Sequence, residues 1–244
     1  MFKCLFIMTL SLLFLLGCSA QPYQAETGSE VEINATGKWS PIVEDNLPNV
    51  LILGDSISIG YTLKVRELLT GQANVFRPNI NNGQKAENCQ GTEFGVGQIT
   101  RWIGDKKWDV IHFNWGLHDL KHVQPDSRKN SNNFNHPRQA EPQIYRTNLV
   151  KIVEQLQTTG AKLVFATTTP YPDGVKPARA PIDALVYNDI ALQLMIEKGI
   201  QINDLYALSE NKLEQIQLPK NVHFNEQGRK LQAAQVAKVI QPLL

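Results

Sequence analysis

The sequence predicts one α/β domain in which a mostly parallel sheet lies between layers of helices. Two observations support this fold class. From Val50 onward, short apolar runs alternate with longer segments of helical periodicity, and such alternation produces a parallel sheet covered by helices on both faces. The length of 244 residues also suits one domain, because single cores stop growing at about 250–300 residues.

We expect the domain to span residues 48–244 and to open with a strand. Residues 50–53 (VLIL) are an apolar run that ends at Gly54, as expected of a buried parallel strand. A helix should follow, because apolar residues repeat at helical spacing in the next segment: Tyr61, Val65, Leu68 and Leu69. Residues 109–114 (DVIHFN) are the next predicted strand.

Further elements complete the expected alternation. In chain order they are a helix marked by Tyr145, Leu149, Ile152, Val153 and Leu156 and closed by Gly160, a strand over 162–169, a helix over 181–198 that Gly199 stops, a strand over 200–202, and a last helix marked by Ala233, Val236, Ala237 and Ile240. In folds of this class, ligands bind beyond the carboxyl ends of the strands. A catalytic residue should therefore follow a strand directly.

Residues 1–17 are predicted to be a signal peptide and are excluded from the fold. Lys3 gives a positive start, and the apolar run over 5–16 is too short to span a bilayer, which takes about 20 residues. The run ends in Leu-Leu-Gly-Cys18, which resembles a bacterial lipobox. This resemblance implies an exported lipoprotein of the cell envelope, held to a membrane by a lipid on Cys18. Ser19 then implies sorting to the outer membrane in a Gram-negative source; the alternative is an ordinary signal peptide with a chance cysteine.

Residues 18–47 are polar and rich in Gly, Ser and Thr, which predicts a flexible tether between the lipid and the domain. Cys4 is removed with the signal peptide and Cys18 carries the lipid, so only Cys89 remains, as a partly buried thiol, and no intramolecular disulfide is expected. The charge is balanced, with 24 basic and 23 acidic residues. It gives no electrostatic reason to expect a nucleic-acid partner.

The candidate nucleophile is Ser56, in the run Gly54-Asp55-Ser56 that follows the first predicted strand. A serine on a strand-to-helix turn presents its Oγ at the sheet edge, and its own amide can donate to a developing oxyanion. Gly-Asp-Ser alone is a weak signal, because a serine here is also a common helix N-cap. A nucleophilic serine needs a base, and His223, just before the last predicted helix, is the candidate.

Four blocks of the sequence resemble the GDSL/SGNH hydrolases and occur in that family's order. They are VLILGDSISIGY, Asn88-Cys89-Gln90-Gly91-Thr92, Gly116-Leu117-His118-Asp119 after DVIHFN, and Lys220-Asn221-Val222-His223 before the last helix. Their order and spacing are more specific than any block alone. The resemblance implies a flavodoxin-like three-layer α/β/α sandwich, the SGNH hydrolase fold.

The resemblance also implies a role for each matching residue. Ser56 would be the nucleophile and His223 the general base. The amides of Ser56 and Gly91 would form two parts of the oxyanion hole, and residue 118 would supply the third donor. No cofactor and no metal are expected.

One departure from the family pattern concerns the oxyanion hole. Residue 118 is His118 where the family has Asn. An imidazole can still donate a hydrogen bond, but its charge state would then matter between about pH 5 and 8.

A second departure concerns the acid of the triad, whose place is taken by Lys220. We expect instead a dyad of Ser56 and His223, in which the backbone near Lys220 or the side-chain oxygen of Asn221 orients the imidazole. A carboxylate from another loop, such as Asp173, is the alternative.

Two further features of the sequence stay open. His118 and His122 are four residues apart, which suits a metal pair on a helix, but no HExxH motif or cysteine accompanies them, and Asp119 after a strand fits the esterase interpretation better. Two long polar loops, 120–142 and 170–181, follow predicted strands. They either border an active site or are plain surface connections.

The predicted function is hydrolysis of a carboxylic ester through an acyl-enzyme on Ser56, with His223 as base. The expected substrate is a small-molecule or polysaccharide ester, first of all an acetyl group on carbohydrate, on the strength of the exported setting and the family. A lysophospholipase, thioesterase or acyltransferase would look similar in sequence. The alternative from another class is a surface-tethered glycan-binding protein with a decayed site, which His118 and Lys220 favour and the intact Ser56, Gly91 and His223 disfavour.

Overall fold

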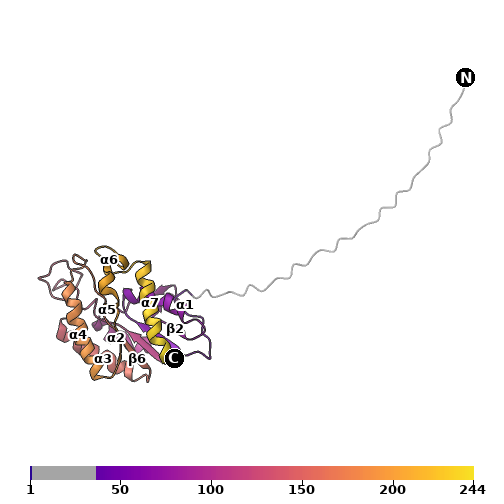
Figure 1. Ribbon diagram of the computed structural model, residues 1–244, viewed down its shortest axis with the longest axis horizontal. Coiled ribbons are helices and arrows are strands. Elements are labelled where there is room, and N and C mark those ends of the chain that lie inside the picture. The colour runs from indigo at the N-terminus through magenta and orange to yellow at the C-terminus, as the bar shows by residue number, and fades with distance from the viewer. Residues whose placement is uncertain (2–36) are drawn as a thin grey trace. The chain divides into compact units, whose positions relative to one another are not determined.

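The computed structural model describes Met1 and residues 37–244 (Figure 1). The rest of the predicted signal peptide, the predicted lipidation site Cys18 and the tether up to residue 36 lie outside the described residues. Their predicted roles therefore stay predictions.

The described residues contain a five-stranded sheet in which all neighbouring strands are parallel. In spatial order the strands are β2 (Asn74–Phe76), β1 (Asn49–Leu53), β5 (Val110–Phe113), β6 (Lys162–Ala166) and β7 (Gln201–Asn203). A separate antiparallel pair is formed by β3 (Asn79–Ile80) and β4 (Lys85–Ala86). The predicted α/β class with a mostly parallel sheet is confirmed.

Helices cover both faces of this sheet. The long ones are α1 (Ser56–Leu68), α2 (Thr92–Ile103), α3 (Pro142–Gln157), α4 (Pro181–Glu197) and α7 (Glu226–Ile240); the short ones are α5 (Leu205–Ser209), α6 (Leu213–Ile216) and the 3₁₀ turns η1 (Glu210–Lys212) and η2 (Gln241–Leu243). Parallel crossovers are right-handed, and α1 connects strands in the opposite direction from α2, α3 and α4. One layer therefore holds α1 with α7, which packs beside it, and the other holds α2, α3 and α4 (Figure 1).

The strand order reverses at β1, because the chain passes from β1 to β2 on one side and later to β5 on the other. At such a switch point the loops that follow the two adjacent strands diverge and leave a crevice. The loop after β1 begins with Gly54 and the loop after β5 contains Gly116. Both sequence blocks therefore lie at the position where this fold class binds ligands.

The core is centred on β1 and β5, whose side chains are inaccessible to solvent at Val50, Ile52, Leu53, Ile111 and Phe113. Helices cover both faces of these strands, so each strand is a continuous apolar run rather than an alternating one. This burial fixes the strand ends from which the functional loops leave.

Strand β6 is shorter than predicted and ends at Ala166. The next residues are threonines, and the Thr168 amide donates to Asn188 Oδ1 of α4 at 2.8 Å instead of pairing with a strand. β-branched residues favour strands, and the threonines therefore extended the predicted strand. In the structure the Thr168 amide is bonded to a side-chain oxygen rather than to a neighbouring strand, so the strand ends earlier.

Helix α2 is absent from the sequence-based prediction. Gly95 and Gly97 lie within it, and glycine disfavours helices. Packing explains the first of them: a Cβ at Gly95 would lie 2.8 Å from Ile152 Cδ1 and 3.0 Å from the Trp115 ring. The close approach of α2 to α3 therefore uses a residue that local propensity counts against a helix.

Residues 37–47, predicted to be the end of the flexible tether, are attached to the domain. Trp39 is buried, and its amide donates to the Gly83 carbonyl at 3.0 Å. Arg66 of α1 donates to the carbonyls of Lys38 and Trp39. The polar composition of residues 18–47 as a whole gives no sign of this local packing.

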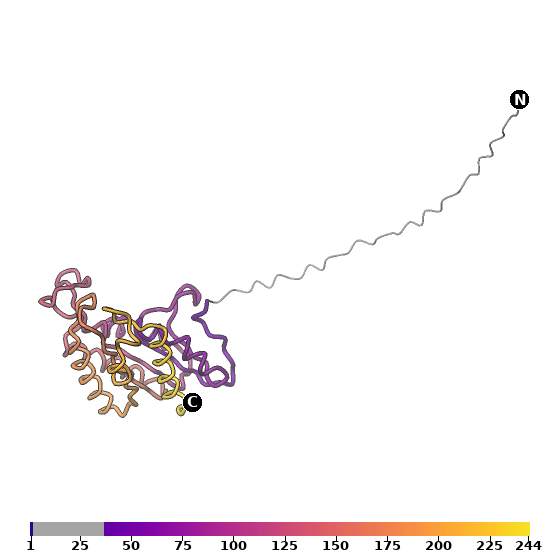
Figure 2. The backbone as a smooth tube through the Cα atoms, turned by 45° about the horizontal axis from the view of Figure 1, so that its top comes forward, coloured from indigo at the N-terminus to yellow at the C-terminus, as the bar shows by residue number. Residues whose placement is uncertain are grey.

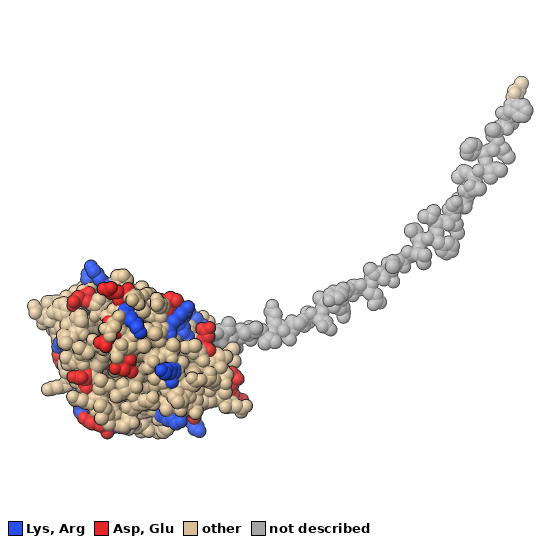
Figure 3. Space-filling model, viewed as in Figure 1, with Lys and Arg blue, Asp and Glu red and all other residues tan. Residues whose placement is uncertain are grey.

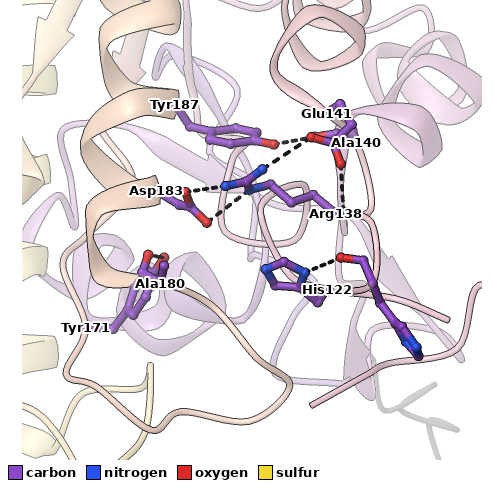
Figure 4. Close-up of polar contacts among 9 residues, drawn as sticks. His122, Arg138, Ala140, Glu141, Tyr171, Ala180, Asp183 and Tyr187 are labelled. Carbon is purple, nitrogen blue, oxygen red and sulfur yellow. Dashed lines mark hydrogen bonds and ion pairs between the residues drawn. The ribbon is translucent and has the colours of Figure 1, made fainter. Parts of the chain in front are cut away.

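The two long polar loops pack against each other. The His122 amide donates to the Ala178 carbonyl, and the Ala178 amide to the Ser131 carbonyl, both at 2.9 Å. Arg138 forms a bidentate ion pair with Asp183 at the start of α4, with N–O distances of 2.7 and 3.0 Å (Figure 4). In Figure 2 the pink trace of the first loop lies at one end of the domain. The loops therefore form one structural unit.

Charged side chains of both signs are interspersed on the face of the domain drawn in Figure 3. Among the described residues, no helix is both long enough and apolar enough to cross a membrane.

Candidate active site

The turn between β1 and α1 presents Ser56 at a helix N-terminus. Asp55 caps the helix, since its Oδ1 accepts the Ile57 amide at 2.9 Å. Gly54 has a φ of +147°, and a Cβ there would lie 3.0 Å from Ser58 Oγ. The Gly-Asp-Ser run therefore has a physical basis at each position, because glycine permits the turn, aspartate caps the helix, and serine follows the cap.

Ser56 and His223 are 167 residues apart in the sequence and in contact in the structure, where Ser56 Oγ lies 2.8 Å from His223 Nε2. On the far side of the ring, His223 Nδ1 lies 2.7 Å from Asn221 Oδ1. The three side chains form a hydrogen-bonded chain in which an amide occupies the place of a carboxylate.

A backbone contact identifies the donors in this chain. The His223 amide, which can only donate, lies 3.0 Å from the same Asn221 oxygen. The Asn221 atom that faces the ring must therefore be the acceptor oxygen, and the imidazole must carry its proton on Nδ1. Nε2 is then unprotonated and can accept the Ser56 hydroxyl proton. This is the tautomer that a general base requires.

Within the described part of the chain, no carboxylate is hydrogen-bonded to His223. Asp173, the alternative acid, is exposed. Lys220 is also exposed, at a left-handed turn position with φ of +51°, and makes no hydrogen bond to His223. Of the two orienting candidates, only Asn221 contacts the ring. Burial lowers the pKa of His223, which favours the neutral imidazole at neutral pH.

Two backbone amides at the site have no hydrogen-bond acceptor among the described residues: those of Ser56 and Gly91. Each lies at the N-terminus of a helix, α1 or α2, where the helix dipole favours negative charge. A Cβ at Gly91 would lie 2.6 Å from Gln139 Nε2 and 3.1 Å from Asp119 Oδ1. Gly91 is therefore required for space, and both amides are available to an oxyanion.

Asp119 holds the Gly91 turn against the loop after β5. Its Oδ1 accepts both the amide of Thr92, at 2.7 Å, and the hydroxyl of Thr92, at 2.6 Å. The carboxyl group is fully buried, and this burial raises its pKa to about 7. Asp119 thereby fixes Gly91 beside its own neighbour, His118.

His118 is a neutral imidazole at this site. Burial lowers the pKa of His118 to about 4. The charge of Asp55 acts in the opposite direction, and the charges of Lys121, Arg179 and His223 lower the pKa further. Its charge therefore does not change between about pH 5 and 8, contrary to the expectation from an unperturbed histidine. Lys121 Nζ lies 3.5 Å from His118 Nδ1. An ammonium group only donates, so Nδ1 is the acceptor and Nε2 carries the proton.

A buried arginine joins the loops that follow β1 and β2. Arg77 Nη2 donates to the Gly54 carbonyl at 2.8 Å and Nη1 to Ser58 Oγ at 2.9 Å. The Cys89 amide donates to the same carbonyl at 3.1 Å. Cys89 is fully buried rather than partly buried, and burial raises the pKa of its thiol to about 11. It is therefore an inert structural thiol.

Three histidines between residues 118 and 136 lie within hydrogen-bond distance of protein groups: His118, His122 and His136. His122 Nδ1 lies 2.6 Å from the His136 carbonyl and donates to it. Among the described residues, no group of three or more His, Cys, Asp or Glu could hold a metal ion.

A cavity of about 230 Å³ opens beside Ser56 and His223. Its other lining residues are Ile57, Gly60, Leu218, Phe224, Arg229 and Gln232. Arg229 is paired with Glu226 at 3.2 Å. The volume is below the ~300–1,000 Å³ of sites that enclose drug-sized ligands, and the lining combines apolar side chains with polar ones.

The structure brings together the residues that the sequence nominated for the site: Ser56, Gly91, His118, Asn221 and His223. It also adds residues that sequence reasoning missed. Lys121 had one available signal, its spacing of three residues from His118. Arg77 had none, because its contacts are all distant in sequence.

The chain matches the model of the GDSL-like lipase/acylhydrolase family over residues 52–231. Among curated proteins, none matches its sequence. Solved structures with the same fold include a lipase/acylhydrolase from Enterococcus faecalis, with 17% identity and a TM-score of 0.63 over 80% of this chain and 96% of that one.

Two other solved structures are similar. The acetyl xylan esterase AlAXEase has 17% identity and a TM-score of 0.61, over 79% of this chain and 99% of that one. A GDSL-like lipase from Bacteroides thetaiotaomicron has 15% identity and a TM-score of 0.60, over 80% and 89%. At these identities the structures establish the shared fold. The family model covers most of the domain, and the chain therefore belongs to the GDSL-like lipase/acylhydrolase family, as its four sequence blocks predicted.

Proposed function

We propose that the protein hydrolyses carboxylic esters by acyl transfer through Ser56. The observation that carries this proposal is the hydrogen-bonded chain of Ser56, His223 and Asn221, with distances of 2.8 and 2.7 Å. His223 Nε2 takes the hydroxyl proton as Ser56 Oγ bonds to the ester carbonyl carbon. The developing oxyanion is stabilised by the amides of Ser56 and Gly91 and by His118 Nε2–H.

The remaining steps balance this proton transfer. When the tetrahedral intermediate collapses, the bond to the alcohol oxygen breaks and His223 returns its proton to that oxygen. A water molecule then attacks the acyl-enzyme with His223 again as base, and the acid is released as Ser56 regains its proton. Asn221 acts throughout as a positioning residue, because it keeps the Nδ1 proton in place but cannot balance the positive charge of the imidazolium.

The proposed substrate class is a short acyl ester, first of all an acetyl group on a carbohydrate. The cavity of about 230 Å³ beside Ser56 supports a short acyl chain. An acetyl xylan esterase among the structures of the same fold is compatible with this assignment. A lysophospholipase or thioesterase would need room for a longer chain.

Labelling with a fluorophosphonate tests the proposed chemistry. The probe should modify Ser56 stoichiometrically, and His223→Ala should abolish the labelling, because an unactivated hydroxyl does not react. In parallel, initial rates on acetate and long-chain p-nitrophenyl esters, acetylated polysaccharides and lysophospholipids would identify the acyl preference. If the folded protein is not labelled but binds glycans, the protein is a glycan-binding protein and the esterase proposal is wrong.

We also propose that the mature protein is held to a membrane by a lipid on Cys18. The lipobox-like Leu-Leu-Gly-Cys18 supports this proposal. Wild-type protein made with its signal should partition into detergent, whereas Cys18→Ala should not acquire a lipid. Recovery of the wild type as an unmodified soluble species would contradict the anchor.

A further inference from the structure

Two cationic side chains that form no ion pair with the described residues lie beside His118, although Asp55 raises the pKa of Arg179 and Asp119 that of Lys121. Arg179 is 5% exposed, and Lys121 is half-buried. Neither takes part in any of the ion pairs formed by the described residues. Burial of an unpaired charge is costly, so two such cations next to a candidate active site call for an explanation.

Hydrogen bonds to backbone carbonyls fix the guanidinium of Arg179. Its Nε donates to the Leu117 carbonyl at 2.9 Å, and its Nη1 to the Pro177 carbonyl at 3.2 Å. Leu117 immediately precedes His118, so the guanidinium lies against the backbone that carries the proposed oxyanion donor. Its remaining terminal nitrogen, Nη2, has no acceptor among the described residues.

The backbone on both sides of Arg179 is anchored. Ala178 pairs with His122 and Ser131 of the neighbouring loop. Ala180 accepts the Tyr171 hydroxyl at 2.9 Å. Together with the ion pair between Arg138 and Asp183 (Figure 4), these contacts hold the loop that carries Arg179 in one position before a ligand arrives.

The electrostatic effects of the two cations agree with the contacts of Lys121 with His118 and of Arg179 with Leu117. Burial is the largest cause of the lowered pKa of His118, of His223 and of Lys121, and the charge of Arg179 lowers each pKa further. Asp55 has the opposite effect on the two imidazoles, and Asp119 has the opposite effect on the lysine. These effects are consistent with a guanidinium that lies near both imidazoles. An anionic group bound among them would offset the mutual repulsion of the two cations.

We propose that Arg179 and Lys121 form a subsite for an anionic group, a carboxylate or a sulfate, on the sugar that carries the ester. Nη2 of Arg179 and Nζ of Lys121 supply donors to its oxygens, and charge-assisted bonds of this kind are the stronger ones. This inference rests on the proposed function and adds a substrate class to it: acylated acidic sugars in preference to neutral ones.

Competition for Ser56 tests the subsite without knowledge of the natural substrate. The rate of fluorophosphonate labelling is measured with galactose, galacturonic acid, galactose 6-sulfate or glycerol phosphate as competitor. We expect at least one acidic sugar to protect Ser56 at a concentration ~10-fold or more below that of galactose, the effect of one hydrogen bond to a charged group. The two acidic sugars distinguish carboxylate from sulfate, and added salt should weaken their protection only.

The variants separate binding from structural support. Lys121→Met and Arg179→Met should each reduce the preference for the acidic sugar, whereas Lys129→Met, an exposed lysine of the same loop, should keep it. If Arg179→Met does not fold, Lys121→Met alone decides. Equal protection by galactose and both acidic sugars, or a preference that survives in Lys121→Met, would overturn the subsite, as would protection by glycerol phosphate alone. Absence of labelling without competitor would instead refute the proposed function.

Discussion

The two histidines of the site have opposite neighbours at the same ring nitrogen. His223 Nδ1 faces an acceptor, Asn221 Oδ1, at 2.7 Å, whereas His118 Nδ1 faces a donor, Lys121 Nζ, at 3.5 Å. A neutral imidazole carries one proton. The ring proton therefore lies on Nδ1 in His223 and on Nε2 in His118.

In the proposed mechanism, this difference would let the same type of side chain serve two purposes. The free nitrogen of His223 is an acceptor, as a base requires, and the free nitrogen of His118 is a donor, as an oxyanion hole requires. Burial lowers the pKa of both rings, so both are neutral at neutral pH. The neighbour, rather than the ring, decides the role.

Removal of the base should have the largest effect. His223→Ala should lower kcat by ~10⁴-fold or more, and Ser56→Ala by a similar factor, since the two act as one unit. The double variant should lose little beyond either single one in steady-state hydrolysis of a short p-nitrophenyl ester. A double variant in which the two losses multiply would show that the residues act separately.

Removal of the proposed oxyanion donor should have the next largest effect. His118→Ala should lower kcat by ~10²–10³-fold with a smaller change in KM. His118→Asn should retain more activity, because its amide restores a donor. Equal rates for the Ala and Asn variants would assign His118 a structural role.

Substitutions of Asn221 should change kcat less than those of His118, and the Ala and Asp variants should change it in opposite directions. Asn221→Ala removes the acceptor that fixes the tautomer and should cost ~10–100-fold in kcat, the range of one hydrogen bond to a group that becomes charged. Asn221→Asp should match or exceed the wild-type kcat, because a carboxylate orients the ring and also stabilises the imidazolium. An Asp variant as slow as the Ala variant would contradict the positioning role.

The pH profile should reflect the lowered pKa of His223. The neutral imidazole is the active form, so kcat/KM should be constant at neutral pH and fall only at pH values below the ordinary histidine pKa of 6.5. In Asn221→Asp the new carboxylate raises the pKa of His223, so the acid limb should move to higher pH. A wild-type limb above 6.5 would contradict the electrostatic account.

Lys220 should matter least. Its side chain is exposed and its backbone adopts a left-handed conformation at φ of +51°. Lys220→Ala should therefore change kcat/KM less than about twofold, since exposed substitutions have small effects. Lys220→Gly is a useful control, because glycine accepts this φ without strain. A large loss in both variants would bring the lysine side chain into the mechanism.

The sequence predicted the fold class and most long elements because strong apolar periodicity marks them. It missed α2, where Gly95 opposes helical propensity but allows close packing against Ile152. It also predicted too long a tether, because the burial of Trp39 is a tertiary effect that composition does not reveal.

The candidate site was predictable where it depends on residue type at a strand end, as at Ser56. Sequence could not choose among the candidates for orienting His223, because that choice depends on where the Asn221 oxygen lies. Two further contacts depend on how the loops fold. Lys121 contacts the His118 side chain, and Arg179 donates a hydrogen bond to the Leu117 carbonyl. Only the folded backbone determines them.

The most direct test of the account is the protonation of the two imidazoles. Long-range proton–nitrogen correlation spectra of protein labelled with ¹⁵N-histidine, recorded at neutral pH, would report each ring nitrogen, and His118→Asn and His223→Ala would assign the signals. We predict a proton on Nδ1 of His223 and on Nε2 of His118. The same tautomer in both rings, or a doubly protonated ring in either, would contradict the conclusion that Asn221 and Lys121 set the two roles.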